Sequence, residues 1–367
     1  MPSPTVAIAH DYLTQRGGAE RVVLSLMRAF PGAPVHTTLY DPAGTYPEFA
    51  DADVRTSALN RVGLLRRDHR LALPFLAPAS SRIHIDADVV IASSSGWAHG
   101  FTTTGRTVVY CHNPARWLYQ TEEYLGGSAW RSPLGPPLLA MRPVLRRWDQ
   151  RRAAEVDVYL ANSRVVQQRI AATYGRDAEL LPPPHGVDPS DPQEPIAELA
   201  DWDAGYALVV SRLLPYKNVD AAIDAVRGTD HRLVVIGRGP EEARLRATLP
   251  DNVRMLSGLT DDQLRWAYAH ASVLVAPSHE DFGLTPLEAA AFGVPTVALR
   301  GGGYLDTIIE GETGSFFDRP EAGEIRSVLD HATSTSWHPD VLRHRAEQFS
   351  ADRFMQRIRA IVMNEEG

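Results

Sequence analysis

The sequence has few of the features that are typical of secreted, membrane-spanning or disulfide-rich proteins. Its 367 residues include a single cysteine, Cys111, so neither an intrachain disulfide nor a zinc site built from several cysteines is available. No apolar run approaches the roughly 20 residues that cross a bilayer. The start, MPSPTVAIAHDYL, has no basic segment followed by an apolar stretch. We therefore expect a cytoplasmic protein, or one held peripherally at the inner face of the plasma membrane.

Two further absences exclude classes of ligand. Lys and Arg number 37 against 45 Asp and Glu, a net charge of -8, so no basic excess exists to neutralise a phosphate backbone, and nucleic acid is not expected as a partner. The sequence also has no G-x-G-x-x-G after a strand, the fingerprint of a dinucleotide site. This disfavours an oxidoreductase.

Short apolar runs alternate with segments of helical periodicity along the whole chain, which predicts an α/β fold. The length favours two domains. Ligands of such folds bind at the carboxyl ends of the parallel strands. The expected strands are Val6–Ala9, Asp88–Ser93, Thr107–His112 and Tyr159–Ala161, then Ala207–Val210, Leu233–Ile236, Val253–Leu256, Val273–Ala276 and Thr296–Leu299.

A proline-rich polar stretch between the two sets of strands is the best interdomain linker. We predict two doubly wound, Rossmann-like domains facing across a cleft, with a final helix packing back across their junction. The predicted bounds are 1–187 for the N-terminal domain, 188–203 for the linker, 204–350 for the C-terminal domain and 351–367 for the helix.

The stretch from His279 to Leu299 carries the most distinct signal in the chain. Thr285 is a candidate cap, Pro286 follows it, and Glu288 would complete a capping box. Glu280 and Glu288 then bracket a turn at a helix start, where backbone N–H groups suit a phosphate and two carboxylates suit hydroxyls on either side. From the segment alone, a sugar-nucleotide site and a plain helix cap are equally favoured.

Other candidate residues follow expected strands, so we expect them at the carboxyl edge of a predicted parallel sheet. Arg212 and Lys217 come after the strand 207–210, where two cations would neutralise a diphosphate. Gly237 lies in the turn after the next strand. In the first half, His112 ends a strand, and Gly17 and Gly18 precede a helix, where paired glycines permit close approach of a ligand.

Two basic stretches, Arg61–Arg70 and Met141–Arg152, mix arginines with apolar residues. In an acidic chain they favour contact with an anionic membrane or acceptor, although a solvated helix face is slightly preferred. Three D-x-D spellings begin at Asp51, Asp86 and Asp201, but none follows an expected strand. We therefore predict no metal, and no cofactor other than the donor as co-substrate.

Several motifs in order resemble family 4 of the retaining glycosyltransferases, of GT-B fold, and its bacterial mannosyltransferase-like branch: AHDYLTQRGGAERV, YCHNPARWLY, SRLLPYKN, VIGRGPE and EDFGLTPLEA. The resemblance spans nearly the whole chain. It implies that Glu280 contacts the transferred sugar, that Glu288 contacts the ribose, and that Arg212 and Lys217 bind the diphosphate. It also implies a sugar contact for His112, a place near leaving group and acceptor for Gly17 and Gly18, and a diphosphate contact for the backbone of Phe282, Gly283, Leu284 and Thr285.

The resemblance implies a hexosyltransferase that moves sugar from a nucleotide sugar to a hydroxyl of a glycan, a lipid-linked saccharide or a small molecule, with retention of configuration. GDP-mannose is the expected donor, and a UDP-sugar is the alternative. A sugar-nucleotide epimerase and a non-catalytic sugar-nucleotide-binding protein remain as other classes. Because Arg212, Lys217, Glu280 and Glu288 are all present, the non-catalytic class is disfavoured.

Overall fold

The chain forms two compact units in a computed structural model that describes residues 4–121, 135–202 and 205–364, without the side chains of Arg70 and Pro137. The first unit contains residues 1–184 and 351–367, and the second contains residues 185–350. The expected linker 188–203 is part of the second unit, because Ile196 and Leu199 are buried in its core beside Tyr206. Asp203 and the predicted bounds at 1, 203, 204 and 367 lie outside the described residues.

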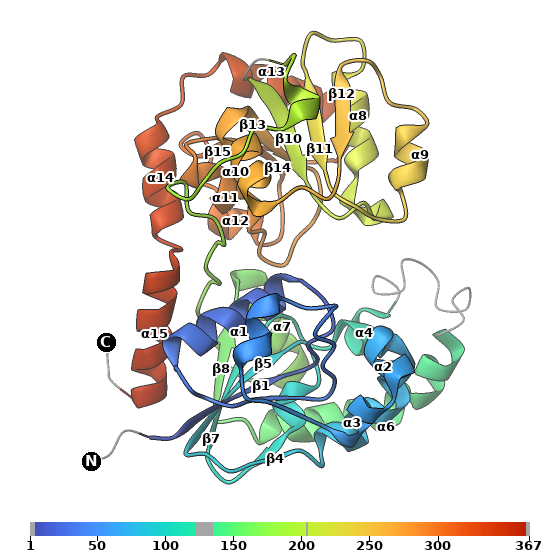
Figure 1. The fold of residues 1–367 in the computed structure, drawn as a ribbon, viewed down its shortest axis with the longest axis vertical. Coiled ribbons are helices and arrows are strands. Elements are labelled where there is room, and N and C mark those ends of the chain that lie inside the picture. Colours follow the sequence, from blue (N-terminus) through green and yellow to red (C-terminus); the bar gives the residue numbers. More distant parts are fainter. Residues whose placement is uncertain (1–3, 122–134, 203–204, 365–367) are drawn as a thin grey trace. The chain divides into compact units, whose positions relative to one another are not determined.

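The first unit is built on a sheet of seven parallel strands in the order β3-β2-β1-β5-β7-β8-β9 (Figure 1). The order reverses direction between β1 and β5, as in a doubly wound fold. Apolar residues of β1, β5, β7 and β8 are buried on both faces, as expected for a parallel sheet covered by helices. The strands are β1 (Val6–His10), β2 (Val35–Thr37), β3 (Val54–Thr56), β5 (Val89–Ser94), β7 (Arg106–Cys111), β8 (Val158–Ala161) and β9 (Glu179–Leu180), with β4 (His84–Ile85) and β6 (Thr102–Thr103) as a separate pair.

Helices connect and cover these strands. The described ones are α1 (Gly18–Ala29), α2 (Gly63–Arg67), α3 (Leu73–Ser80), α4 (Arg116–Tyr119), α6 (Gly135–Ala154), α7 (Arg164–Tyr174) and α15 (Ala351–Met363), with 3-10 turns η1 (Pro47–Asp51), η2 (Ala58–Arg61), η3 (His69–Ala72) and η4 (Ala98–Gly100). Within the part of the chain that the structure describes, no helix combines the length and the apolar character that crossing a membrane requires.

The second unit has a sheet of six parallel strands in the order β12-β11-β10-β13-β14-β15, which reverses between β10 and β13. Its strands are β10 (Tyr206–Val210), β11 (Leu233–Ile236), β12 (Val253–Leu256), β13 (Ala271–Ala276), β14 (Thr296–Leu299) and β15 (Gly314–Phe317). Its helices are α8 (Val219–Val226), α9 (Glu242–Arg246), α10 (Asp261–His270), α11 (Thr285–Ala291), α12 (Tyr304–Thr307), α13 (Ala322–Ser334) and α14 (Pro339–Glu347), with turns η6 (Ala197–Leu199) and η7 (Pro215–Lys217).

The expected α/β architecture with two doubly wound parallel sheets is confirmed. Each strand predicted from an apolar run is present, with its ends displaced by at most two residues. Parallel strands buried on both faces require continuous apolar runs, which is why the sequence predicts them well.

Helix α15 follows the second unit in the sequence but belongs to the first (Figure 1). Phe354, Ile358 and Val362 repeat at a spacing of four, which places them on one face of the helix. All three are buried in the same apolar cluster as Val22 and Leu26 of α1. The first unit is therefore completed only by the end of the chain.

We expect Ile358→Ala to lower the free energy of unfolding of the first unit by about 2–5 kcal/mol, because a fully buried side chain is cut back to leave a cavity. Gln356→Ala on the exposed face of α15 is the matched control and should change stability little. Urea unfolding followed by hydrogen exchange in α1 and α15 measures both. Equal stability of the two variants would contradict the packing described.

Candidate active site

Two loops of the second unit lie at the switch point of its sheet, which is the place between β10 and β13 where the strand order reverses. The loop after β10 contains Arg212 and ends in η7 with Lys217, and the loop after β13 contains Ser278 and Glu280. Strands β10 and β13 are hydrogen-bonded neighbours, so these loops start side by side at the carboxyl edge of the sheet. In open α/β sheets this is the position at which ligands bind.

Lys217 and Glu280 form an ion pair across this edge. The Lys217 side chain is 9% exposed and that of Glu280 is 26% exposed. The Ser278 hydroxyl donates to the same Glu280 oxygen, Oε1, at 2.6 Å. A buried ammonium without a counterion would cost several kcal/mol, so the carboxylate serves as the internal counterion of Lys217.

The backbone beside Lys217 fixes its direction. Asn218 adopts a left-handed conformation with φ 52° and its side-chain amide donates to the carbonyl of Pro277 at 2.9 Å. This bond ties the loop after β10 to the loop after β13. Arg212 lies exposed in the first of these loops, and among the described residues no acidic side chain pairs with it. The structure thus provides one paired and one solvent-facing cation in the same loop.

The expected capping box at Thr285 is wrong. Leu284 already has helical dihedrals (φ -78°, ψ -33°) and is the N-cap, so Thr285 is the first helical residue, and no side chain caps the helix. Nearby, the hydroxyl of Tyr304 lies 3.5 Å from that of Ser278. Burial raises the pKa of Tyr304 well above its ordinary value, so its phenol stays protonated. The Glu288 carboxylate has a partner on another helix.

That partner is Tyr268 on α10, whose hydroxyl donates to Glu288 Oε2 at 2.7 Å. Both side chains are buried, at 0% exposure for Tyr268 and 6% for Glu288. The phenol holds this buried carboxylate in one orientation. The structure therefore fixes the orientation of Glu288 through tertiary packing rather than through the helix end.

The turn between the two carboxylates is held by glycines. Gly283 has φ +83°, and a Cβ there would lie 2.3 Å from the Tyr304 ring. Gly303 donates its N–H to the carbonyl of Glu280 at 2.9 Å, and Phe282 is buried beneath the turn. Residues larger than glycine do not fit at Gly283 or Gly303, where a Cβ would lie 2.2 Å from Phe282. The backbone from Phe282 to Thr285 is consequently rigid.

Gly237 has a structural reason to be glycine. A Cβ at this position would lie 1.8 Å from the carbonyl of Ser211, so the turn after β11 packs directly on the loop after β10. The predicted ligand contact of Gly237 stays a prediction.

In the first unit, the switch point between β1 and β5 also gathers polar side chains. His112 follows β7 directly, and its backbone is held by Ser94 and by the Asn162 amide. Its Nε2 lies 2.8 Å from the hydroxyl of Ser93, at the end of β5. Burial, together with the charge of nearby His10, lowers the pKa of His112 to about 3, so the ring is neutral.

Gly17 is the N-cap of α1 and Gly18 its first residue. A Cβ at Gly17 would lie 2.7 Å from Oε2 of Glu20, a buried carboxylate of the same helix. Among the described residues this oxygen has no hydrogen-bond partner. The residues predicted from the sequence do not include Glu20, His10 or Ser93, although His10 and Ser93 lie at strand ends as His112 does.

Cys111 and two of the D-x-D aspartates, Asp88 and Asp201, have other contacts. Cys111 packs in the core opposite His112, and burial raises its thiol pKa. Asp88 accepts from the backbone and hydroxyl of Thr5, and Asp201 pairs with Arg254. Within the described ranges, no group of three or more His, Cys, Asp or Glu side chains is placed to hold a metal ion.

Two family models match consecutive parts of the chain. "Glycosyltransferase Family 4" matches residues 16–191, and "Glycosyl transferases group 1" matches residues 192–349. Together they span 16–349.

Curated relatives match over part of their length. The GDP-mannose-dependent alpha-(1-6)-phosphatidylinositol monomannoside mannosyltransferase of Mycolicibacterium smegmatis is 31% identical over 215 residues, 52% of this chain and 56% of the relative. The D-inositol 3-phosphate glycosyltransferase of Acidothermus cellulolyticus is 36% identical over 153 residues, 35% of this chain and 34% of the relative. The matches thus span from about a third to just over half of these relatives.

Solved structures match over almost the whole chain. Anabaena HepE in complex with UDP-glucose has a TM-score of 0.70 at 17% identity, covering 98% of this chain and 99% of the other. Sucrose-phosphate synthase of Thermosynechococcus elongatus has a TM-score of 0.69 at 17% identity, covering 97% of each chain. Such low identity shows the fold alone. With the two family models, these likenesses establish that the chain belongs to the family 4 glycosyltransferases and has the GT-B fold.

Proposed function

We propose that the protein is a retaining hexosyltransferase that moves a sugar from a nucleoside diphosphate sugar to an acceptor hydroxyl. The observation that carries this proposal is the Lys217–Glu280 pair at the switch point of the second unit. It supplies a shielded cation for a diphosphate and a carboxylate for sugar hydroxyls from neighbouring loops.

Donor binding in this site is an exchange of partners. The diphosphate replaces Glu280 as the counterion of Lys217, and the released carboxylate accepts from hydroxyls of the sugar. Arg212, exposed in the same loop, adds the second cation. The seven-residue helix α11 is too short to carry the diphosphate by itself, so the cations bear the main electrostatic role.

Glu288 contacts the ribose hydroxyls in this proposal. Its Tyr268 bond holds the carboxylate before the ligand arrives, which reduces the ordering that binding requires. Phe282, Gly283, Leu284 and Thr285 provide the backbone that lies against the diphosphate, in a turn already fixed by Gly303.

The chemical step breaks the bond between the anomeric carbon and the phosphate oxygen. Lys217 and Arg212 stabilise the negative charge that grows on the departing diphosphate. The acceptor oxygen bonds to the anomeric carbon from the same face, and its proton passes to the departing phosphate oxygen. Neither a dedicated protein base nor a metal ion is part of this proposal.

GDP-mannose is the proposed donor, supported by similarity to the GDP-mannose-dependent mannosyltransferases of Mycolicibacterium smegmatis and Mycobacterium tuberculosis. A UDP-sugar is the alternative, supported by the UDP-glucose complex of Anabaena HepE. For the acceptor we propose a saccharide or a lipid-linked saccharide, since the same relatives act on a phosphatidylinositol mannoside.

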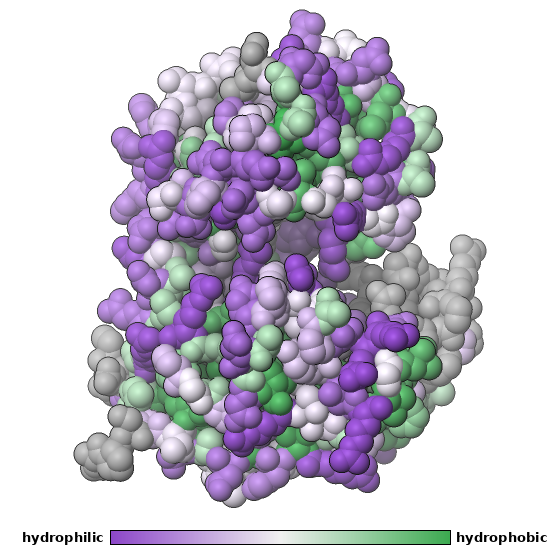
Figure 2. Space-filling view, in the orientation of Figure 1, coloured by the Kyte–Doolittle hydropathy of each residue, from purple (hydrophilic) through white to green (hydrophobic). Residues whose placement is uncertain are grey.

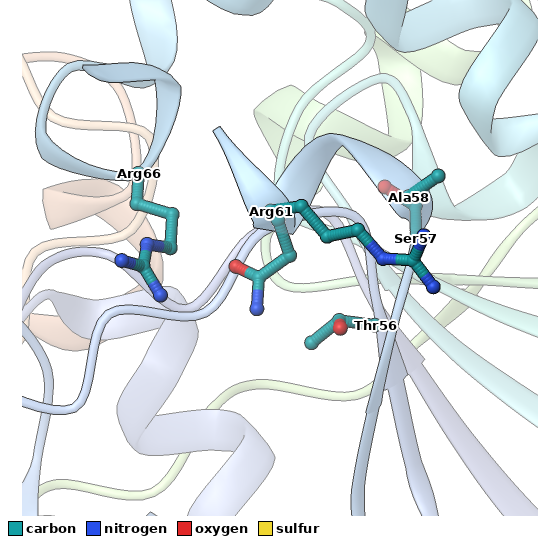
Figure 3. A pocket seen from close by; sticks show the side chains of 6 residues that line it. Thr56, Ser57, Ala58, Arg61 and Arg66 are labelled. Atoms are coloured by element: carbon teal, nitrogen blue, oxygen red, sulfur yellow. The ribbon is translucent and has the colours of Figure 1, made fainter. Parts of the chain in front are cut away.

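A basic and apolar surface on the first unit supports a lipid-linked acceptor. Among described residues of that unit outside α15, the exposed large apolar side chains all lie in or beside η2, α2, η3, α3 and α6: Val62, Leu64, Leu71, Phe75 and Val144. Where these elements lie in Figure 1, Figure 2 shows hydrophobic residues (green) beside hydrophilic ones (purple). Arg61 and Arg66 line a pocket of about 390 Å³ here with no acidic residue in its wall (Figure 3). An anionic membrane fits both properties.

A donor screen tests the transferase proposal. We expect slow hydrolysis of one nucleoside diphosphate hexose, GDP-mannose before UDP-glucose or UDP-N-acetylglucosamine, with release of the nucleoside diphosphate unaffected by EDTA. Isothermal titration of the same donors separates binding from turnover. Absence of binding and turnover with every donor, acceptors included, would reject the transferase; binding without turnover would favour the non-catalytic alternative.

Glu280→Gln should lower kcat/KM by at least about 100-fold, because sugar contact in the transition state is lost. Affinity for the nucleoside diphosphate should stay equal or rise, since Lys217 no longer has a competing carboxylate.

The matched control is Glu310→Gln, which breaks an exposed ion pair with Arg300 in the same unit and should change neither quantity. Full transfer by Glu280→Gln, or loss of its diphosphate binding, would contradict the partner exchange.

Sedimentation with vesicles tests the membrane contact. We expect binding to phosphatidylglycerol vesicles, weakened by salt, and little binding to phosphatidylcholine. Arg61→Gln combined with Arg66→Gln removes two charges worth about 1 kcal/mol each, roughly a 30-fold loss of affinity. Arg319→Gln with Arg343→Gln, exposed arginines of the second unit, makes the same change in net charge as a control. Equal binding by the two double variants would contradict the proposed surface.

A further inference from the structure

A line of buried polar side chains crosses the carboxyl edge of the first unit's sheet. Glu20 of α1 lies 3.8 Å from Nε2 of His10, which ends β1. Nδ1 of His10 lies 3.1 Å from both the carbonyl and the hydroxyl oxygen of Ser93, and that hydroxyl lies 2.8 Å from Nε2 of His112. Glu20, His10 and Ser93 are at most 2% exposed. These side chains therefore connect the carboxyl ends of three strands, β1, β5 and β7.

The Ser93 carbonyl determines where the proton of His10 lies. A carbonyl oxygen can only accept, so Nδ1 of His10, at 3.1 Å from it, must carry hydrogen. This holds whether the ring is neutral or charged. It also means that the Ser93 hydroxyl cannot donate to Nδ1 of His10.

The Ser93 hydroxyl then has His112 as its acceptor. Because Nδ1 of His10 carries hydrogen, Nε2 of His112, 2.8 Å away, is the acceptor that the contacts of the described residues offer to the hydrogen of this hydroxyl. An imidazole nitrogen that accepts a hydrogen bond is unprotonated, and in a neutral ring the proton then lies on the other nitrogen. His112 is consequently left with a hydrogen on Nδ1.

The groups around His10 support this assignment. Burial lowers its pKa, but the neighbouring Glu20 and Asp11 carboxylates outweigh burial and raise it above the ordinary value. The Asp11 carboxylate is occupied by backbone N–H groups of Ser95, Trp97 and Ala98, so Glu20 is the partner that faces Nε2 of His10. Glu20 therefore faces the ring nitrogen of His10 that Ser93 does not contact.

We propose that His10 and Ser93 are positioning residues that hold His112 in the neutral Nδ1–H tautomer and present that N–H as a donor to a hydroxyl of the sugar being transferred. The tautomer is a property of the free protein. Its use in the reaction rests on the proposed function. The ring orientation is supported from the other side by Tyr110, which contacts the His112 ring edge-on with centroids 5.2 Å apart.

Nitrogen NMR of histidine-labelled protein without substrate tests the tautomer. Two-bond and three-bond couplings from ring protons to ring nitrogens distinguish Nδ1–H from Nε2–H, and a His112→Gln variant assigns the signals. We expect Nδ1–H in the wild type and loss of that preference in Ser93→Ala, while Ser93→Thr, which keeps the hydroxyl, retains it. An Nε2–H or charged His112 in the wild type would overturn the inference, whatever the enzyme's activity.

Kinetics test whether the reaction uses this tautomer. Ser93→Ala should lower kcat/KM for the donor about 10- to 100-fold, as loss of partners that orient a site residue commonly does. Ser93→Thr should restore most of it. Ser80→Ala is the matched control, because Ser80 is equally buried and its hydroxyl has no hydrogen-bond partner in the described part of the chain. A shifted tautomer with unchanged kcat/KM would overturn the role in transfer, whereas inactivity of the wild type toward every donor would reject the proposed function and leave the tautomer result intact.

Discussion

Parallel pairing of the central strands is the constraint on which both candidate sites depend. When all strands of a sheet run the same way, each chain segment that leaves a strand emerges at one edge, and neighbouring strands at the reversal of order leave in opposite directions around the sheet. In the second unit this brings residues 63 positions apart, Lys217 and Glu280, into contact. In the first unit it aligns His10 with Ser93, 83 positions away. Neither contact depends on a local sequence motif, because each follows from the strand order.

The ion pair also changes how affinity in the second unit should be understood. Lys217 is buried and would be costly to leave unpaired, so the protein supplies its own anion. In the proposed function, a ligand diphosphate gains only the difference between its interaction with Lys217 and that of Glu280. In return, the cation is already desolvated and aligned, which matters for stabilising charge that develops during reaction. An internal counterion thus weakens ground-state binding but keeps the site ready for chemistry.

The sequence predicted features that depend on local pattern and missed those that depend on tertiary contacts. The apolar run Val273–Ala276 and the polar residues after it placed Glu280 correctly at a strand end. The capping box failed because Gly283, with φ +83°, turns the chain so that Leu284 is already helical. Tyr268, which orients Glu288, lies on another helix, and no pattern within residues 279–299 points to it. The predicted linker begins after the boundary between the two units. Ile196 and Leu199 pack in the core of the second unit, but two apolar residues in a proline-rich segment make no pattern that would predict this.

The two switch points differ in electrostatics, and this difference fits separate roles. The edge of the second unit carries a fixed cation and two carboxylates, a combination that distinguishes an anion from the hydroxyls beside it. The edge of the first unit carries a neutral His112, whose lowered pKa prevents it from acquiring charge near neutral pH. A neutral N–H donor can bind a hydroxyl without attracting an anion, because it has no net charge. His112 therefore adds no charge of its own beside the buried pair of His10 and Glu20.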